Sequence, residues 1–142
     1  MKKIFAAVIP ALVLVVSCQS PATKQSLEAQ QLAQEAIAIH DDIMPQIPVF
    51  DKTTVKIDSI LSELPNIAGN NPSADTATLR VDLETLRANL ESATDFMMTW
   101  MYEYKPDSTD IEYQKAEVEK VKAMKQQFEE VAVESNAKLS SF

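Results

Sequence analysis

The chain has 142 residues. This length is enough for one domain, even if an N-terminal signal is removed, but is short for two domains. It contains a single glycine and a single cysteine, which excludes a glycine-rich phosphate loop, a disulfide and a thiolate metal cluster. The 21 acidic side chains outnumber the 13 basic ones, and a surface of this sign repels nucleic acid and anionic head groups. Nucleic acid is therefore not an expected partner.

The first seventeen residues have the pattern of an export signal. Lys2 and Lys3 precede an apolar run, residues 4–16, which leads to a small residue and a cysteine. A transmembrane helix fits less well, because crossing the hydrocarbon core takes about 20 apolar residues. A buried core helix also fits less well, because two lysines before an uninterrupted apolar run are typical of export. The sequence predicts a signal peptide over residues 1–17.

The end of this segment resembles the lipobox of bacterial lipoproteins, in which the cysteine is acylated and becomes the mature N-terminus. Val15 and Ser17 are acceptable lipobox residues before Cys18. The resemblance implies a Cys18 that carries several acyl chains, palmitate among them, and such an anchor holds a protein stably on a membrane. Gln19 follows the cysteine, where an aspartate would retain the lipoprotein in the inner membrane. The same resemblance therefore favours the inner leaflet of the outer membrane, facing the periplasm.

The mature sequence predicts an all-α fold. Processing leaves 11 basic and 21 acidic side chains, a formal charge of −10. The composition is rich in Ala, Leu, Glu, Gln and Lys and poor in glycine, which favours long helices. We expect a lipidated cysteine and tether over residues 18–24, and a three-helix antiparallel bundle over residues 25–142. Short connections make sequential helices antiparallel neighbours.

The first helix is expected from about Pro21 or Thr23 to Leu64. Its seam alternates in steps of three and four, as in helices that pack against other helices. The seam residues are Ala33, Ala36, His40, Ile43, Ile47, Phe50, Thr54, Ile57, Leu61 and Leu64. The phase continues across Pro45 and Pro48, which predicts one long helix kinked there rather than two unrelated helices.

The second helix is expected after a turn at residues 65–72, which contains two prolines, the glycine and three asparagines. Ser73 or Asp75 is positioned to cap it, and residues 105–107 to end it. Its predicted seam consists of Leu79, Leu83, Leu86, Leu90, Thr94, Met97, Met101 and Tyr104.

The third helix is expected to open at Thr109 and Glu112, which have the spacing of a capping box. Its predicted seam consists of Ile111, Val118, Val121, Met124, Phe128, Val131 or Ala132, Ser135 and Leu139. This seam is the most polar of the three, so we expect the third helix to be held least tightly.

One group of residues could carry chemistry, and it consists of the only histidine and four methionines. The residues are His40, Met44, Met97, Met98 and Met101. Equal distances from the predicted turn, roughly 35 Å, place them in one layer near the start of the third helix. Imidazole and thioether groups suit Cu(I), and a His/Met pair could also hold haem. The competing interpretation is packing, with methionines filling space at the Pro45 kink and His40 bonded to a freed carbonyl.

The other polar and aromatic candidates are expected to be structural. Asp41 and Asp42 should face solvent, because two adjacent residues cannot share one helix face. Trp100 should be a packing anchor whose indole N–H needs a partner. The charged stretch of residues 117–130 should form an exposed, ion-paired face, and no carboxylate is expected on an apolar seam.

Two motifs, His-Asp-x-x-Met-Pro and Met-Met-x-Trp-Met followed by Tyr-Lys-Pro, resemble small lipoproteins of Gram-negative bacteria. Some of these are labelled "viral A-type inclusion protein" repeats. The resemblance runs from the lipobox to the third helix and implies an architecture without an activity. It rests on His40, Asp41, Met44, Pro45, Met97, Met98, Trp100 and Met101.

These observations leave three functional hypotheses. The first is a non-enzymatic, membrane-anchored interaction or structural module without a cofactor, whose protein partner the sequence does not identify. The alternative is a lipoprotein that binds Cu(I) or another soft metal through the histidine and the methionines. An enzyme that uses paired carboxylates as acid and base fits least, because no nucleophile–base pair is apparent.

Overall fold

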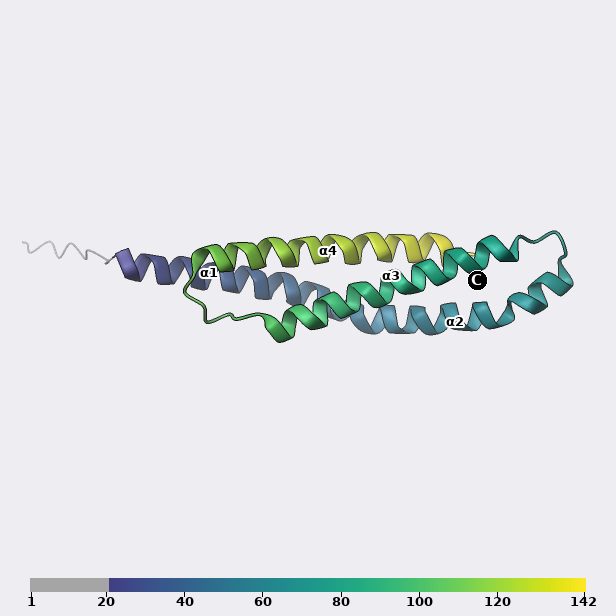
Figure 1. Cartoon of the computed structure of the whole chain (residues 1–142), viewed down its shortest axis with the longest axis horizontal. Helices are drawn as coiled ribbons and strands as arrows, with labels where there is room; N and C mark the ends of the chain where they lie inside the picture. The colour runs from purple at the N-terminus through teal and green to yellow at the C-terminus, as the bar shows by residue number, and fades with distance from the viewer. Residues whose placement is uncertain (1–20) are drawn as a thin grey trace, which may run out of the picture.

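The computed structural model describes residues 21–142, which form long helices that pack side by side along one axis (Figure 1). The elements are α1 (Pro21–Ile43), a 3-10 turn η1 (Met44–Gln46), α2 (Ile47–Asn70), α3 (Thr76–Glu103) and α4 (Ile111–Leu139). The all-α prediction is confirmed. Within the described residues, no helix combines the length and the apolar character needed to cross a bilayer.

The predictions for the N-terminus fall largely outside the described residues. The predicted signal peptide, Cys18 and the first residues of the predicted tether lie outside residues 21–142. α1 begins at Pro21, one of the two predicted starts of the first helix, so residues 21–24 belong to this helix.

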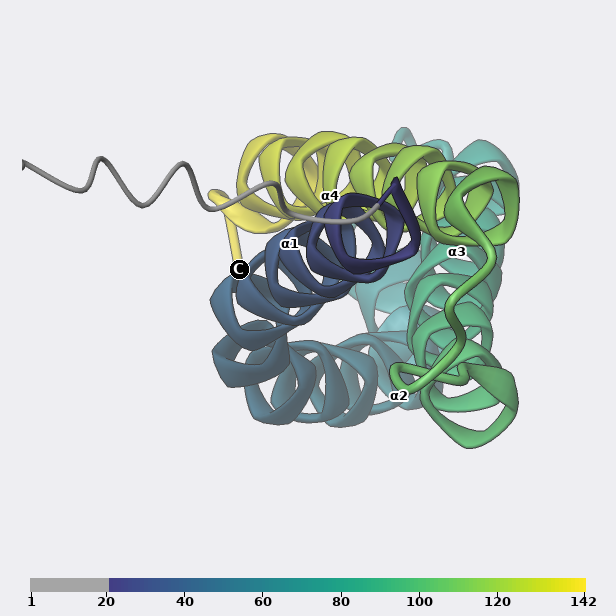
Figure 2. The same cartoon turned by 90° about the vertical axis from the view of Figure 1, so that its left-hand side faces the viewer.

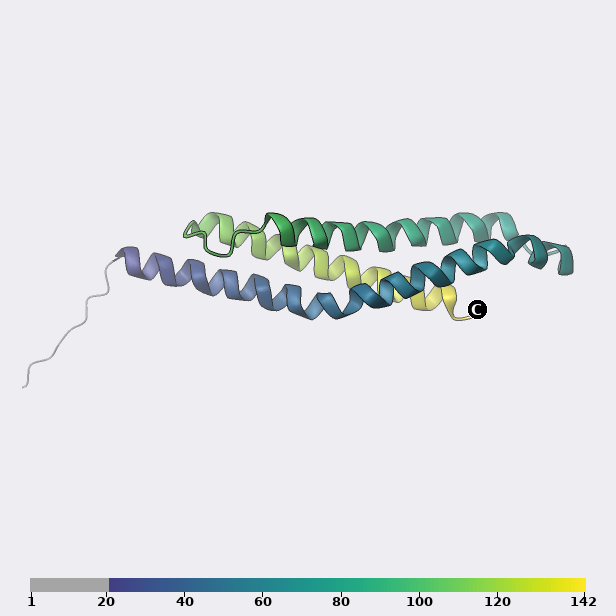
Figure 3. The same ribbon diagram turned by 90° about the horizontal axis from the view of Figure 1, so that it is seen from below.

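α1 and α2 follow each other along the length of the molecule (Figure 3). α1 packs mainly against α4, and α2 packs against α3, so the chain changes its neighbour at η1 (Figure 2). Pro45 lies in η1 and Pro48 lies in the first turn of α2. The backbone N–H groups of a first turn have no partner within the helix, so the missing N–H of proline costs no hydrogen bond there. The predicted seam is buried on both sides of this turn, at Ala36, Ile43 and Phe50.

α2 ends later than the sequence predicted. The helix continues past Leu64, through Pro65 and Gly69, to Asn70. Pro65 is exposed, so water can satisfy the carbonyl that loses its bond to the proline nitrogen. The amide of Asn71 closes the end of the helix by donating to the Ile67 carbonyl at 2.9 Å.

Both later helices begin at an aspartate cap. The Asp75 carboxylate accepts from the backbone N–H of Thr78 at 3.0 Å and from its hydroxyl at 2.7 Å. These two bonds lower the pKa of Asp75. At α4 the cap is Asp110, which accepts from the amides of Glu112 and Tyr113, and not Thr109 as predicted.

The core on α3 departs from the predicted seam after Leu90. Leu83, Leu86 and Leu90 are buried as expected. Further along, Ala93 and Trp100 are buried in place of the predicted Thr94 and Met101, whereas the predicted Met97 is fully buried. The buried set keeps a strict alternation of steps, whereas the predicted seam took two steps of four in succession.

α4 contributes nine buried residues, more than any other helix of the described chain. It contacts both α1 and α3, and its Phe128 ring stacks 4.8 Å from the ring of Phe50. The expectation that this helix is held least tightly is therefore wrong. Its buried polar side chains have hydrogen-bond partners, so burying them does not carry the cost of an unpaired polar group.

Candidate functional site

Side chains from α1, α3 and α4 meet in one aromatic layer near the α3–α4 loop. The Trp100 ring lies 5.6 Å from the imidazole of His40 and stacks on the Tyr104 ring at 4.5 Å. Tyr104 in turn lies 6.4 Å from Tyr113 at the start of α4. His40 is thus level with the end of α3 and the start of α4, as the predicted register required.

The two nitrogens of His40 have different environments. Nδ1 lies 3.0 Å from Oδ1 of Asp41, an exposed carboxylate. Nε2 is buried and has no hydrogen-bond partner among the described residues. The suggestion that His40 bonds a freed carbonyl at the proline kink is therefore wrong.

The structure divides the predicted methionine group. Met97 is fully buried, and Met44 packs, partly buried, against the same core cluster, which also contains Trp100. Met98 and Met101 are each 44% exposed. The prediction that Met101 points inward is wrong, because Trp100 occupies that position of the seam.

A buried carboxylate lies on the other side of Trp100. The indole Nε1 donates to Oε2 of Glu117 at 2.7 Å, and Nζ of Lys120 donates to Oε1 at 2.7 Å. Trp100 therefore has the partner that its N–H was expected to need. Glu117 is only 6% exposed, so the expectation that no carboxylate lies on a seam is wrong. Strict alternation backwards from Val121 leads to Glu117 and then Gln114, and this signal could have found both.

The side chain of Gln114 holds the α3–α4 loop in place through hydrogen bonds. Its Oε1 accepts from the Tyr104 hydroxyl at 2.8 Å. Its Nε2 donates to three loop carbonyls, those of Lys105, Pro106 and Ser108. Burial, reinforced by nearby Tyr113 and Glu117, raises the pKa of Tyr104 to about 12, so this hydroxyl remains a donor at physiological pH. These contacts assign Gln114 and Tyr104 a structural role.

The predicted surface charges are mostly where the sequence put them. Asp41 and Asp42 are exposed, and Asp42 pairs with Lys125 of α4 at 3.1 Å. Lys122 bridges to Glu35 of α1 at 3.0 Å. The outer face of α4 is therefore ion-paired, with Glu117 as the buried exception.

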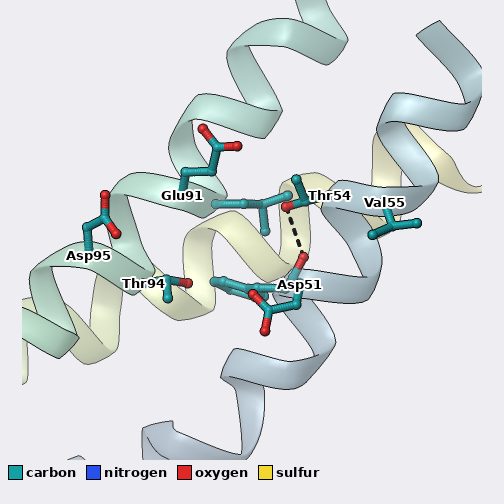
Figure 4. Close-up of a pocket in the computed structure, with 8 residues that line it drawn as sticks. Asp51, Thr54, Val55, Glu91, Thr94 and Asp95 are labelled. Atoms are coloured by element: carbon teal, nitrogen blue, oxygen red, sulfur yellow. Dashed lines mark hydrogen bonds between the residues drawn. The ribbon is translucent and has the colours of Figure 1, made fainter. Parts of the chain in front are cut away.

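A groove of about 490 Å³ lies between α2 and α3 (Figure 4). Its lining combines apolar, hydroxyl and carboxylate side chains: Phe50, Leu90, Val55, Thr54, Thr94, Asp51, Glu91 and Asp95. Asp51 stands on α2, and Glu91 and Asp95 stand on α3. Glu91 pairs with Arg87 at 3.0 Å, whereas Asp51 and Asp95 have no ion-pair partner in the described part of the chain. Sequence reasoning missed this groove, because it arises between two helices.

Within residues 21–142, no group of three or more His, Cys, Asp or Glu side chains is arranged to hold a metal ion. Comparisons with family models, curated proteins and solved structures find no match to this chain. The resemblance to Gram-negative lipoproteins therefore stays a prediction.

Proposed function

We propose that this protein is a non-enzymatic lipoprotein of the cell envelope, anchored through Cys18 and facing the periplasm from the outer membrane. The lipobox resemblance supports the anchor. α1 begins at Pro21, so the bundle would stand close to the bilayer, with its long first helix kinked at Pro45 and Pro48. Its partners would be the membrane, through the acyl chains, and another envelope protein.

The groove between α2 and α3 is the observation that carries the interaction role. It combines apolar surface from the exposed Val55 with carboxylates that lack a cation, Asp51 and Asp95. Lysine and arginine stems lie well on apolar surface while their head groups reach a carboxylate. The occupant that complements this groove is a basic amphipathic segment of a partner protein.

Binding of a cationic helix should depend on the groove carboxylates. A synthetic helical peptide of alanine and lysine is expected to bind the full chain in non-ionic detergent. Asp51→Asn/Asp95→Asn should weaken binding about tenfold at low salt, as two lost ion pairs imply. Fluorescence anisotropy of a labelled peptide measures the change.

The control variant is Asp107→Asn/Glu129→Gln, which removes the same charge from exposed positions outside the groove. It should bind the peptide like the original chain. Equal weakening by both double variants would show general charge attraction and would refute docking in the groove. A glutamate version of the peptide should not bind.

The anchor is tested by Cys18→Ser. The serine lacks the thiol to which the lipid anchor is attached, so we expect an uncleaved precursor or a protein lost from the detergent phase. Partition into a phase-separating detergent, together with incorporation of labelled palmitate, measures the effect. Ser20→Ala, outside the lipobox, is the matched control. A Cys18→Ser protein that is processed and partitioned like the original would contradict the lipoprotein assignment.

The second candidate is binding of Cu(I) or another soft metal by His40 and the nearby methionines. A single observation favours it, namely the buried and unpartnered Nε2 of His40.

A further inference from the structure

His40 Nε2 is a buried polar atom without a hydrogen bond. Among the buried side-chain nitrogen and oxygen atoms of residues 21–142, it is the one that lacks a partner. A buried donor or acceptor left in this state destabilises the folded protein. Native proteins seldom retain such a group unless a ligand, a water molecule or a catalytic role accounts for it.

The carboxylate at Nδ1 determines which form of the imidazole is present. Nδ1 must carry the hydrogen to donate to Asp41, so in the neutral ring Nε2 holds the lone pair. Histidines that bind metals commonly have this arrangement, in which a carboxylate orients the ring and raises the basicity of the other nitrogen. The exposed Asp41 and the buried Nε2 place the carboxylate outside and the ligand atom inside the bundle.

Two methionines lie near His40 and Trp100 along their own helices. Met44 follows His40 by one helical turn, and Met97 precedes Trp100 by three residues on α3. Both methionines pack in the cluster that contains Trp100, and the Trp100 ring is 5.6 Å from the imidazole. Thioether and imidazole ligands favour Cu(I) over hard cations.

We infer that His40 Nε2, Met44 and Met97 form a three-coordinate site for one Cu(I) ion between α1 and α3. The site uses three of the five residues that the sequence singled out and leaves the exposed Met98 and Met101 outside. It is independent of the α2–α3 groove and of the lipid anchor. The copper site can therefore be tested separately, whether or not the groove and the anchor are confirmed.

The test is a Cu(I) titration of the full chain in non-ionic detergent, without oxygen and with a reductant. A colorimetric Cu(I) chelator competes for the ion and reports the affinity. Trp100 is the only tryptophan of the chain, so quenching of its emission reports binding in its own layer. We expect one Cu(I) per chain, with quenching that saturates at the same ratio.

Variants identify the ligands. Met44→Leu and Met97→Leu nearly conserve volume, so the core should survive, and each should weaken Cu(I) binding at least about tenfold. His40→Ala should abolish it, and Asp41→Asn should weaken it about 10–100-fold as the loss of an orienting carboxylate. Met98→Leu/Met101→Leu is the matched control and should bind like the original chain.

Three outcomes would overturn the inference. The first is that the original chain takes up no Cu(I), which would make Nε2 an unpaired or water-bound packing atom. The second is that Met98→Leu/Met101→Leu weakens binding as much as Met97→Leu, which would place the metal at the surface. The third is that His40→Ala retains full affinity. In the lipidated chain Cys18 has no free thiol that could compete for Cu(I).

Discussion

Leu86→Ala is expected to lower the free energy of unfolding by about 2–5 kcal/mol, the usual cost of truncating a core leucine. Leu86 is fully buried on α3, between Leu83 and Leu90. The rigid helices around it can close only part of the resulting cavity. The loss is a large share of the roughly 5–15 kcal/mol that stabilises a typical domain. Urea unfolding followed by circular dichroism measures it.

The matched control is Val81→Ala on the same helix, because Val81 is 62% exposed. Its effect should stay within about 0.5 kcal/mol, as for most surface substitutions. If Leu86→Ala unfolds at the same urea concentration as Val81→Ala, the buried face of α3 has been assigned wrongly.

Glu117→Leu is expected to cost about 1–3 kcal/mol although it adds an apolar side chain to the core. The substitution leaves the buried indole N–H of Trp100 without its 2.7 Å acceptor, and an unmet donor carries this penalty. Lys120 contributes little, because its side chain is 54% exposed and water can solvate the freed ammonium group. Urea unfolding followed by circular dichroism measures the loss.

A double-mutant cycle separates this hydrogen bond from packing. Trp100→Phe removes the donor, so Glu117→Leu should cost much less in that background than in the original chain. Glu117→Gln retains an acceptor oxygen and should lose less stability than Glu117→Leu. Equal costs of Glu117→Leu with and without the indole N–H would rule out the hydrogen bond as the source of the effect.

Periodicity was enough to predict the helical architecture and much of the core. The alternating seam identified Ile57, Leu83 and Phe128 as buried, and cap chemistry identified Asp75 as one of two candidate starts of α3. These features are local, since a helix's own sequence determines which residues share a face. Distances counted from the predicted turn placed His40 opposite Met98, two residues from Trp100, whose ring lies beside the imidazole.

The wrong predictions concern positions whose burial depends on contacts with another helix. Trp100 and Met101 fit the seam of α3 about equally well, and Trp100 takes the buried position where it stacks on Tyr104 and bonds Glu117. A glutamate in a charged stretch is typical of a solvated face, so its charge outweighed the seam spacing that leads to Glu117, and the indole of Trp100 accounts for its burial. The end of α2 was predicted too early, because a proline on an exposed face does not have to end a helix.

The pairing of α1 with α4 has a consequence for the order in which the molecule can assemble. A polypeptide emerges N-terminus first, so α1 appears before the other helices of residues 21–142, and its main neighbour appears last. α2 and α3 can join as a hairpin as soon as Glu103 has emerged, because their contacts are local in sequence. Meanwhile three of the four buried side chains in residues 23–43 of α1 are small, those of Ala29, Ala33 and Ala36, and the fourth is Ile43 at the end of the helix. Small side chains expose little apolar surface, so this segment can remain solvated without inviting aggregation until residues 111–139 arrive.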